Sequence, residues 1–190
     1  ELTQTMRAYG ATVILTPAST GIIGSRDYAD KKVAEGGYIM LNQFANEDNW
    51  KAHYNTTGPE IWEDTEGTVT HFVSAMGTTG TIIGTSTYLK EKKPSIKIVG
   101  AQPSDGSQIP GIRKWPQEYL LKIFDAAKVD TVIEVSETEA RAMTKCLAKE
   151  EGVFAGMSSG GSVAAALKIA ETLESAVIVA IFCDRGDPYL

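Results

Sequence analysis

The stretch Thr68–Lys90 constrains the fold of this chain more than any other part of it. It begins with β-branched and aromatic residues, which are typical of a mostly buried strand. It then breaks into Gly77–Thr81 and resumes with apolar residues at helical spacing. A strand, a Gly–Thr turn and a helix favour an anion site, because backbone N–H groups, hydroxyls and the positive end of the helix dipole converge there. The simpler interpretation is a tight turn that a threonine caps.

Segments of strand and helix character alternate along nearly the whole chain. The expected strands are 11–16, 38–41, 69–75, 95–101, 131–135 and 176–182. Because these segments are apolar on both faces, they predict an α/β fold with a mostly parallel twisted sheet flanked by helices. The last strand is continuously apolar, which predicts a central position. We expect a smaller lobe over residues 1–45 and a larger lobe over residues 46–190.

Composition excludes several classes of partner and compartment. The formal charge of −6 argues against a nucleic-acid or anionic-membrane partner, since neither is attracted to a net-negative surface. No apolar run has the length of a membrane span, and the first residues do not form a signal peptide. The two cysteines do not form a disulfide framework, so we expect a reduced cytoplasmic protein.

The loops that follow the predicted strands are where a ligand is expected, because parallel sheets bind ligands outside the carboxyl ends of their strands. These loops are 42–46, 76–81, 103–116, and the pair 156–161 and 183–187. In the loop 156–161, Ser158 either caps the helix that follows or gives its hydroxyl to a ligand. Cys183 follows a buried strand and suits either inert packing or the wall of a pocket.

The charged and imidazole side chains give weaker signals. Arg113 and Lys114 are most simply a solvated basic pair, although they could also meet an anionic substrate. His53 and His71 have no metal-ligand spacing with each other or with the cysteines, so we interpret both as structural and expect no metal site.

Three motifs together resemble the cysteine synthase family. They are Asn55–Trp62, Met76–Thr81 and Gly156–Gly160. Members of this family are fold type II pyridoxal-phosphate (PLP) enzymes, related to tryptophan synthase β, and the similarity runs over essentially the whole chain. Two further segments, Ile109–Pro116 and Ile181–Asp187, are similar to the B branch of the family.

The resemblance implies a β-replacement reaction in which O-acetylserine and sulfide, or thiosulfate, are the small-molecule substrates and PLP is the cofactor. It also implies a homodimer. The residues that it assigns to the cofactor are Gly77, Thr78, Thr79, Gly80 and Thr81 for the phosphate and Ser158 for the pyridine nitrogen. The residues that it assigns to the substrate pocket are Gln43, Arg113 and Cys183. Lys114 stands where the B branch has arginine, which argues against a bidentate anion contact there.

The family's Schiff-base lysine, in an Asn-Pro-x-x-Ser-x-Lys-Asp-Arg motif, is absent from these residues, as is its Ser/Thr-Gly-Asn-Thr-Gly loop. We therefore assign no catalytic residue, expect the chain to be a piece of a longer enzyme, and predict that it is inactive alone. Two alternatives stay open. One is another fold II enzyme, such as a cystathionine β-synthase or a serine/threonine dehydratase, and the other is a non-catalytic module that binds a phosphate ligand.

Overall fold

The computed structural model describes residues 2–116 and 121–187, and the chain divides into two compact units, residues 1–42 and 43–190. The smaller unit contains the helix α1 (Leu2–Ala8), a 3-10 turn at Ala18–Thr20 and the helix α2 (Gly21–Glu35). α2 ends at Glu35 and is followed by its C-cap Gly36, whose φ of 89° suits glycine.

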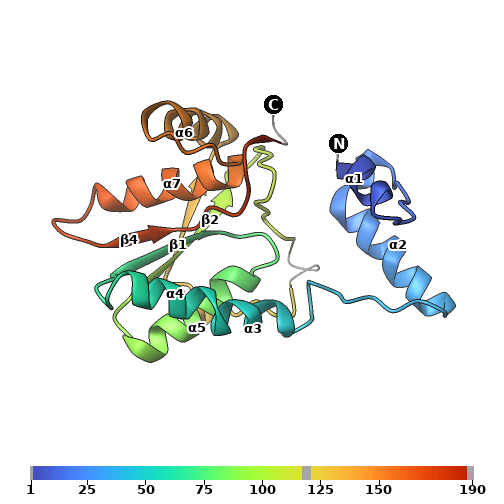
Figure 1. Ribbon diagram of the computed structural model, residues 1–190, viewed down its shortest axis with the longest axis horizontal. Coiled ribbons are helices and arrows are strands. Elements are labelled where there is room, and N and C mark those ends of the chain that lie inside the picture. The colour runs from blue at the N-terminus through green and yellow to red at the C-terminus, as the bar shows by residue number, and fades with distance from the viewer. Residues whose placement is uncertain (1, 117–120, 188–190) are drawn as a thin grey trace. The chain divides into compact units, whose positions relative to one another are not determined.

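The larger unit is a parallel sheet between two layers of helices (Figure 1). Its strands are β1 (His71–Ala75), β2 (Lys97–Pro103), β3 (Thr131–Val135) and β4 (Ile178–Ala180), in the order β3-β2-β1-β4. The helices α6 (Glu137–Glu150) and α7 (Met157–Ala170) cover one face. The other face is covered by α3 (Asp48–Asn55), α4 (Thr57–Asp64) and α5 (Gly80–Lys92), and a 3-10 turn lies at Ala126–Lys128. The predicted α/β class is confirmed.

Both faces of the sheet are buried because successive strand residues point to opposite faces. Val73 and Val99 are paired neighbours that pack with the α6 and α7 residues, whereas Phe72 and Ile98 pack with the α5 residues. These four side chains are 2% exposed or less. Such two-sided burial explains why the strands are apolar throughout, and it fixes the carboxyl ends of β1 and β2 side by side.

Four local predictions are wrong. Residues 11–16 and 38–41 are not strands, and Ile39 is 95% exposed, because no described strand lies beside either segment to complete its backbone hydrogen bonds. The last strand, β4, pairs with β1 alone among the described strands and therefore lies at an edge. α7 begins at Met157, so the predicted turn at 156–161 is mostly helix.

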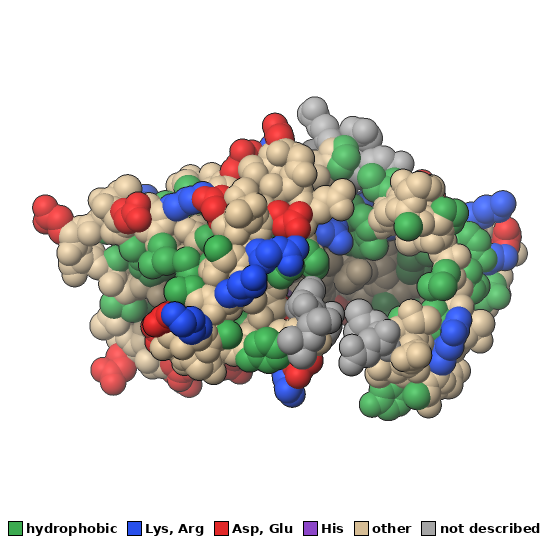
Figure 2. Space-filling model, turned by 90° about the horizontal axis from the view of Figure 1, so that it is seen from above, with side chains coloured by type: hydrophobic (Ala, Val, Ile, Leu, Met, Phe, Trp, Pro, Cys, Tyr) green, Lys and Arg blue, Asp and Glu red, His purple; other side chains and the backbone are tan. Residues whose placement is uncertain are grey.

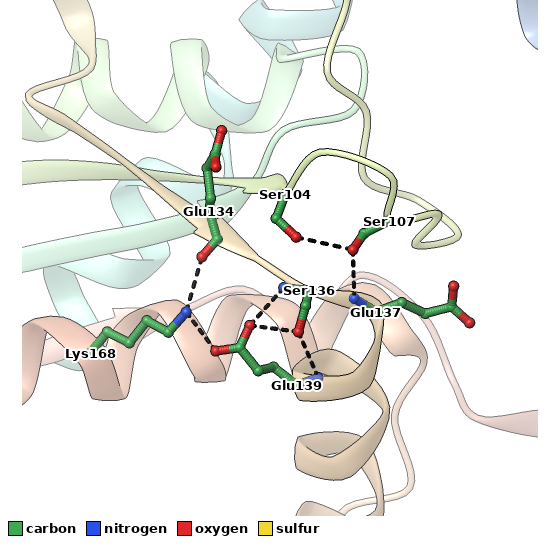
Figure 3. Close-up of polar contacts among 7 residues, drawn as sticks. All are labelled: Ser104, Ser107, Glu134, Ser136, Glu137, Glu139 and Lys168. Atoms are coloured by element: carbon green, nitrogen blue, oxygen red, sulfur yellow. Dashed lines mark hydrogen bonds and ion pairs between the residues drawn. The ribbon is translucent and has the colours of Figure 1, made fainter.

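A polar network holds the loop after β2 to the start of α6 (Figure 3). A capping box begins α6: Ser136 Oγ accepts from the Glu139 N–H, and Glu139 accepts from the Ser136 N–H at 2.7 Å. Ser107 Oγ accepts from the Glu137 N–H at 3.2 Å, and Lys168 from α7 pairs with Glu139 at 2.7 Å. The network thereby fixes the base of the loop that carries residues 109–116.

Charges are mixed on the surface. On the face that Figure 2 shows, Asp and Glu side chains are interspersed with Lys and Arg, and neither sign gathers into a broad patch. None of the helices in the described part of the chain is long and apolar enough to cross a membrane. Within residues 2–116 and 121–187, no group of three His, Cys, Asp or Glu side chains is arranged to hold a metal ion.

Candidate cofactor-binding site

The turn between β1 and α5, residues 76–81, is the centre of the site. Its residue Thr79 is the N-cap of α5 and has φ 69°, a left-handed conformation that is rare for a β-branched residue. The side chain of Thr79 caps nothing, whereas Thr78 Oγ1 accepts a long hydrogen bond, 3.4 Å, from the N–H of Gly80 at the start of the helix. Strained backbone of this kind is found preferentially where a ligand is bound.

The turn presents donors that the described protein does not use. The backbone N–H groups of Gly77, Thr78, Thr79 and Thr81 have no acceptor among the described residues. Thr79 Oγ1 is buried, in a residue 4% exposed, and it too lacks a partner within the described part of the chain. Because buried polar groups are almost always paired, such a cluster at the start of a 13-residue helix suits an anion that supplies the missing acceptors.

Glycine is required in this turn because other chain segments approach the backbone closely. A Cβ on Gly77 would lie 2.9 Å from the carbonyl oxygen of Gly111, and a Cβ on Gly80 would collide with the side chain of Asn49. The backbone of Gly111 therefore lies on one side of the turn and the side chain of Asn49 on the other.

Ser158 lies in the first turn of α7 and is 3% exposed. The N-cap of α7 is Gly156 and no side chain caps the helix, so the capping alternative for Ser158 is wrong. Its hydroxyl donates a long hydrogen bond, 3.4 Å, to Asp184 Oδ1. Gly111 lies against it, since a Cβ there would be 3.0 Å from the Ser158 Cβ. Gly111 therefore contacts both Ser158 and the turn of residues 76–81, which is called the anion turn below after the role predicted for it.

A small pocket opens beside the turn, and Thr79 and Arg113 are among its lining residues. The other lining residues are Met76, Gln102, Trp115, Leu121 and Phe124. The Arg113 N–H donates to the carbonyl of Met76 at 2.8 Å, and its guanidinium donates to the carbonyl of Ile112 at 2.9 Å. These bonds hold the exposed Arg113 side chain at the rim of the pocket.

Lys114 points to a different set of partners from Arg113. Its ammonium is 2.8 Å from both Asp105 and Glu134, and these hydrogen bonds raise the pKa of Lys114 above its usual value. A lysine that is held by two carboxylates is already neutralised, so the structure does not bring Lys114 into the site.

Gln43 is exposed and lies in the turn before α3. The main-chain carbonyl of Gln43 accepts a hydrogen bond from Asn49 Nδ2 at 2.7 Å. The side-chain amide of Asn49 also donates to Thr78 Oγ1 at 3.1 Å. The structure thus links the Gln43 turn to the anion turn through Asn49. Sequence reasoning missed Asn49, because a polar residue at the start of a helix has no distinctive signal until its partner 29 residues away is known.

Cys183 follows β4 and is a free, exposed thiol. Its pKa is raised because nearby atoms limit hydration of the thiolate and because Asp184 adds a negative charge. Such a thiol is a poor nucleophile at neutral pH. The neighbouring Gly156 N–H donates to the Asp184 carbonyl at 3.0 Å, which ties this segment to the start of α7 beside Ser158.

Comparison with known proteins supplies the family. The family model "Pyridoxal-phosphate dependent enzyme" matches residues 1–184. The chain belongs to this family. The predicted resemblance is therefore confirmed, and so is the cofactor class: PLP is the cofactor of these enzymes.

Individual relatives narrow the comparison. The chain is 59% identical over 97% of its length to cysteine synthase B of Pseudomonas aeruginosa, and it spans 62% of that protein. A crystal structure of cysteine synthase from Entamoeba histolytica matches with a TM-score of 0.89 and 37% identity, over 99% of this chain and 59% of that one. A crystal structure of an O-acetylserine-dependent cystathionine β-synthase from Helicobacter pylori matches with a TM-score of 0.87 and 38% identity, over 99% of this chain and 64% of that one.

The residues of the anion turn fit the phosphate of PLP. A phosphate group offers several acceptor oxygens and a double negative charge, and the turn offers unpaired N–H groups, the buried Thr79 hydroxyl and the N-terminus of α5. Gly77–Thr81 would hold the phosphate. Ser158, near Gly111, would face the ring nitrogen. These roles stay predictions, as do those of Gln43, Arg113 and Cys183.

Proposed function

We propose that the protein containing this chain converts O-acetyl-L-serine and sulfide into L-cysteine and acetate, with PLP as cofactor. With thiosulfate in place of sulfide, the product is S-sulfocysteine. The structural observation that carries the proposal is the set of unpaired donors at Gly77–Thr81, which suits the cofactor phosphate. The similarity to cysteine synthase B supports the choice of reaction among PLP enzymes.

Each candidate residue has one role in this proposal. When bound, PLP withdraws electrons from the α-carbon of the amino acid and so allows acetate to leave from the β-carbon. Gly77–Thr81 anchor the phosphate and thereby fix the position of the ring. Ser158 places a neutral hydroxyl at the ring nitrogen, and a hydroxyl stabilises a positive charge on that nitrogen less than a carboxylate does. This favours β-elimination over chemistry that needs a stronger electron sink.

The substrate is proposed to bind on the side of Gln43, whose side chain would help to hold the carboxylate of O-acetylserine. Arg113, at the rim of the pocket next to Thr79, would attract the anionic sulfur donor. Cys183 does not line the pocket beside Thr79, and in this proposal it would form a compact wall of the substrate site on the side of Ser158. Its raised pKa keeps the thiol neutral, so it does not repel the incoming sulfur anion.

The test is product analysis. The protein, supplied with PLP, O-acetylserine and either sulfide or thiosulfate, is expected to release cysteine or S-sulfocysteine together with one acetate per turnover, as followed by mass spectrometry. A protein that binds PLP but forms neither product from O-acetylserine would contradict this function.

The second candidate is a cystathionine β-synthase reaction, which the likeness to the H. pylori structure favours. Homocysteine would then replace sulfide as the nucleophile. Competition between equal concentrations of sulfide and homocysteine distinguishes the two, since cystathionine as the main product would support the second candidate and cysteine the first.

We also propose that the 190-residue chain alone makes no cysteine, because the Asn-Pro-x-x-Ser-x-Lys-Asp-Arg lysine motif does not occur in it. Borohydride reduction in the presence of PLP is expected to leave no stoichiometric adduct on a specific lysine. Such an adduct would contradict the proposal. We further propose that the whole protein is a homodimer in the cytoplasm.

A further inference from the structure

Helix α3 lies against the first turns of α5, and two glycines of α5 make the close approach possible (Figure 1). A Cβ on Gly80 would collide with Asn49, and a Cβ on Gly84 would lie 2.8 Å from the Cβ of His53. Asn49 and His53 are four residues apart, so they share one face of α3. That face is directed at the start of α5, where the anion turn ends.

Asn49 has a fixed orientation. Its Nδ2 donates to the carbonyl of Gln43 at 2.7 Å and to Thr78 Oγ1 at 3.1 Å. A backbone carbonyl can only accept, so the amide nitrogen, and not the amide oxygen, must lie on this side. Both hydrogens of the Asn49 amide are then assigned.

The orientation of Asn49 determines what Thr78 can do. Thr78 Oγ1 accepts from Asn49 and, at 3.4 Å, from the N–H of Gly80. A hydroxyl has two lone pairs and one hydrogen, so both acceptor positions are occupied and only donation remains. Since no described residue accepts that hydrogen, the Thr78 hydroxyl is left as a donor for a ligand.

His53 makes the equivalent contact with the other end of the turn. Its Nε2 is 3.2 Å from Thr81 Oγ1 and its Nδ1 is 2.9 Å from Thr57 Oγ1. Burial lowers the pKa of His53, so the ring is neutral at pH 7 and carries one N–H. If Thr57 donates to Nδ1, then Nε2–H donates to Thr81, and the Thr81 hydrogen is free for a ligand.

We propose that α3 is a positioning element for the cofactor phosphate: Asn49 and His53 hold the hydroxyls of Thr78 and Thr81 as hydrogen-bond donors toward it. This inference rests on the proposed cofactor role of Gly77–Thr81 and assigns a function to two residues that do not themselves contact the phosphate. It replaces the interpretation of His53 as purely structural. It also explains Gly80 and Gly84, which give the two side chains room.

The experiment compares PLP with pyridoxal, which lacks the phosphate. Dissociation constants for both are measured by absorbance titration of the purified protein, and the ratio of the two constants isolates binding to the phosphate. Asn49→Ala is expected to lower the preference for PLP about tenfold, the usual effect of losing one well-directed hydrogen bond to a charged group. Pyridoxal affinity should change less than twofold.

Further variants separate orientation from stability. Asn49→Asp keeps the shape of the side chain, but its carboxylate can only accept, so Thr78 would donate its hydrogen to it. The preference for PLP over pyridoxal should then fall at least as far as in Asn49→Ala. His53→Ala should lower the preference in the same way, whereas His53→Gln, whose amide can donate where Nε2 does, should retain most of it. Asn55→Ala is the matched control, because Asn55 is exposed at the end of the same helix.

The outcomes are distinct. Loss of PLP preference in Asn49→Ala and Asn49→Asp, with Asn55→Ala unchanged, supports the inference. An unchanged preference, or equal weakening of PLP and pyridoxal, overturns it and leaves Asn49 with a role in folding alone. If the unmodified protein does not prefer PLP to pyridoxal, the proposed cofactor site itself fails. Unfolding curves for each variant identify any that do not fold, and in that case the isosteric Asn49→Asp decides.

Discussion

The indole N–H of Trp115 donates a hydrogen bond to the carbonyl of Gly77 at 2.8 Å, across 38 positions of sequence. The same ring packs edge-on against Phe44, with ring centroids 5.4 Å apart. Trp115 thereby connects three loops at the carboxyl edge of the sheet: the turn of Gln43, the anion turn and the segment 109–116. The positions of the substrate and cofactor residues relative to one another depend on this contact.

Trp115→Phe should loosen the anion turn while keeping an aromatic ring against Phe44. Loss of the hydrogen bond is expected to lower the free energy of unfolding by about 1 kcal/mol and to weaken PLP binding. Urea unfolding and cofactor titration measure the two effects. Phe44→Leu removes the ring contact but not the bond to Gly77, so it should affect stability more than cofactor affinity. The reverse order would show that the bond to Gly77 is unimportant.

Thr79→Gly should increase stability and impair cofactor binding. The left-handed backbone at Thr79 costs on the order of 1 kcal/mol, and glycine adopts it freely. The Thr79 hydroxyl has no partner among the residues described, so its removal forfeits no hydrogen bond there. A higher thermal midpoint together with a lower preference for PLP over pyridoxal is expected. A variant that loses stability would show that the Thr79 side chain is there for packing.

The capping box of α6 should make stability depend on acid pH. Hydrogen bonds from Lys168 and Ser136 lower the pKa of Glu139 to about 2, from an ordinary value of 4.5. Because the folded-state pKa is the lower one, the ionised Glu139 stabilises the fold fully above pH 4.5, and this contribution is lost as the pH falls toward 2.

Glu139→Gln should therefore cost about 1 kcal/mol at pH 7, since Glu139 is partly exposed and the effect is that of a capping interaction. The difference from the unmodified protein should shrink as the pH falls, as measured by unfolding at several pH values. Thr138→Ala, in the same turn and exposed, is the control. A difference that does not vary between pH 7 and 3 would contradict the assigned ion pair.

Arg113 and Lys114 should differ in their effect on an anionic substrate. Arg113→Ala is expected to raise KM for the dianion thiosulfate about tenfold, and for sulfide less, because Arg113 lines the pocket. Lys114→Ala should leave both KM values nearly unchanged, since Lys114 is held by Asp105 and Glu134. Initial-rate kinetics of cysteine and S-sulfocysteine formation check this. Equal effects of the two substitutions would place both side chains at the pocket.

Local sequence patterns predicted the elements whose structure is decided by nearby residues. The strand β3 and the turn after β1 were predicted because each is specified by residues within a few positions of one another, and the capping box at Ser136 and Glu139 is local in the same way. Residues 11–16 and 38–41 have the composition of strands, but a strand forms only beside another strand, and that information is not local. The edge position of β4 is non-local in the same way.

The sequence by itself determined the α/β class, the family and the presence of a turn at Gly77–Thr81 between a strand and a helix, since alternation of elements and the glycine spacing are properties of the chain order. Only the tertiary structure decided that Asn49 and His53 reach the threonines of that turn, that Lys114 is neutralised by two carboxylates, and that Gly111 contacts both Gly77 and Ser158. The reason is physical: hydrogen-bond direction and steric exclusion depend on atoms from separate parts of the sequence, which for the two threonines of the turn lie 28 and 29 positions apart.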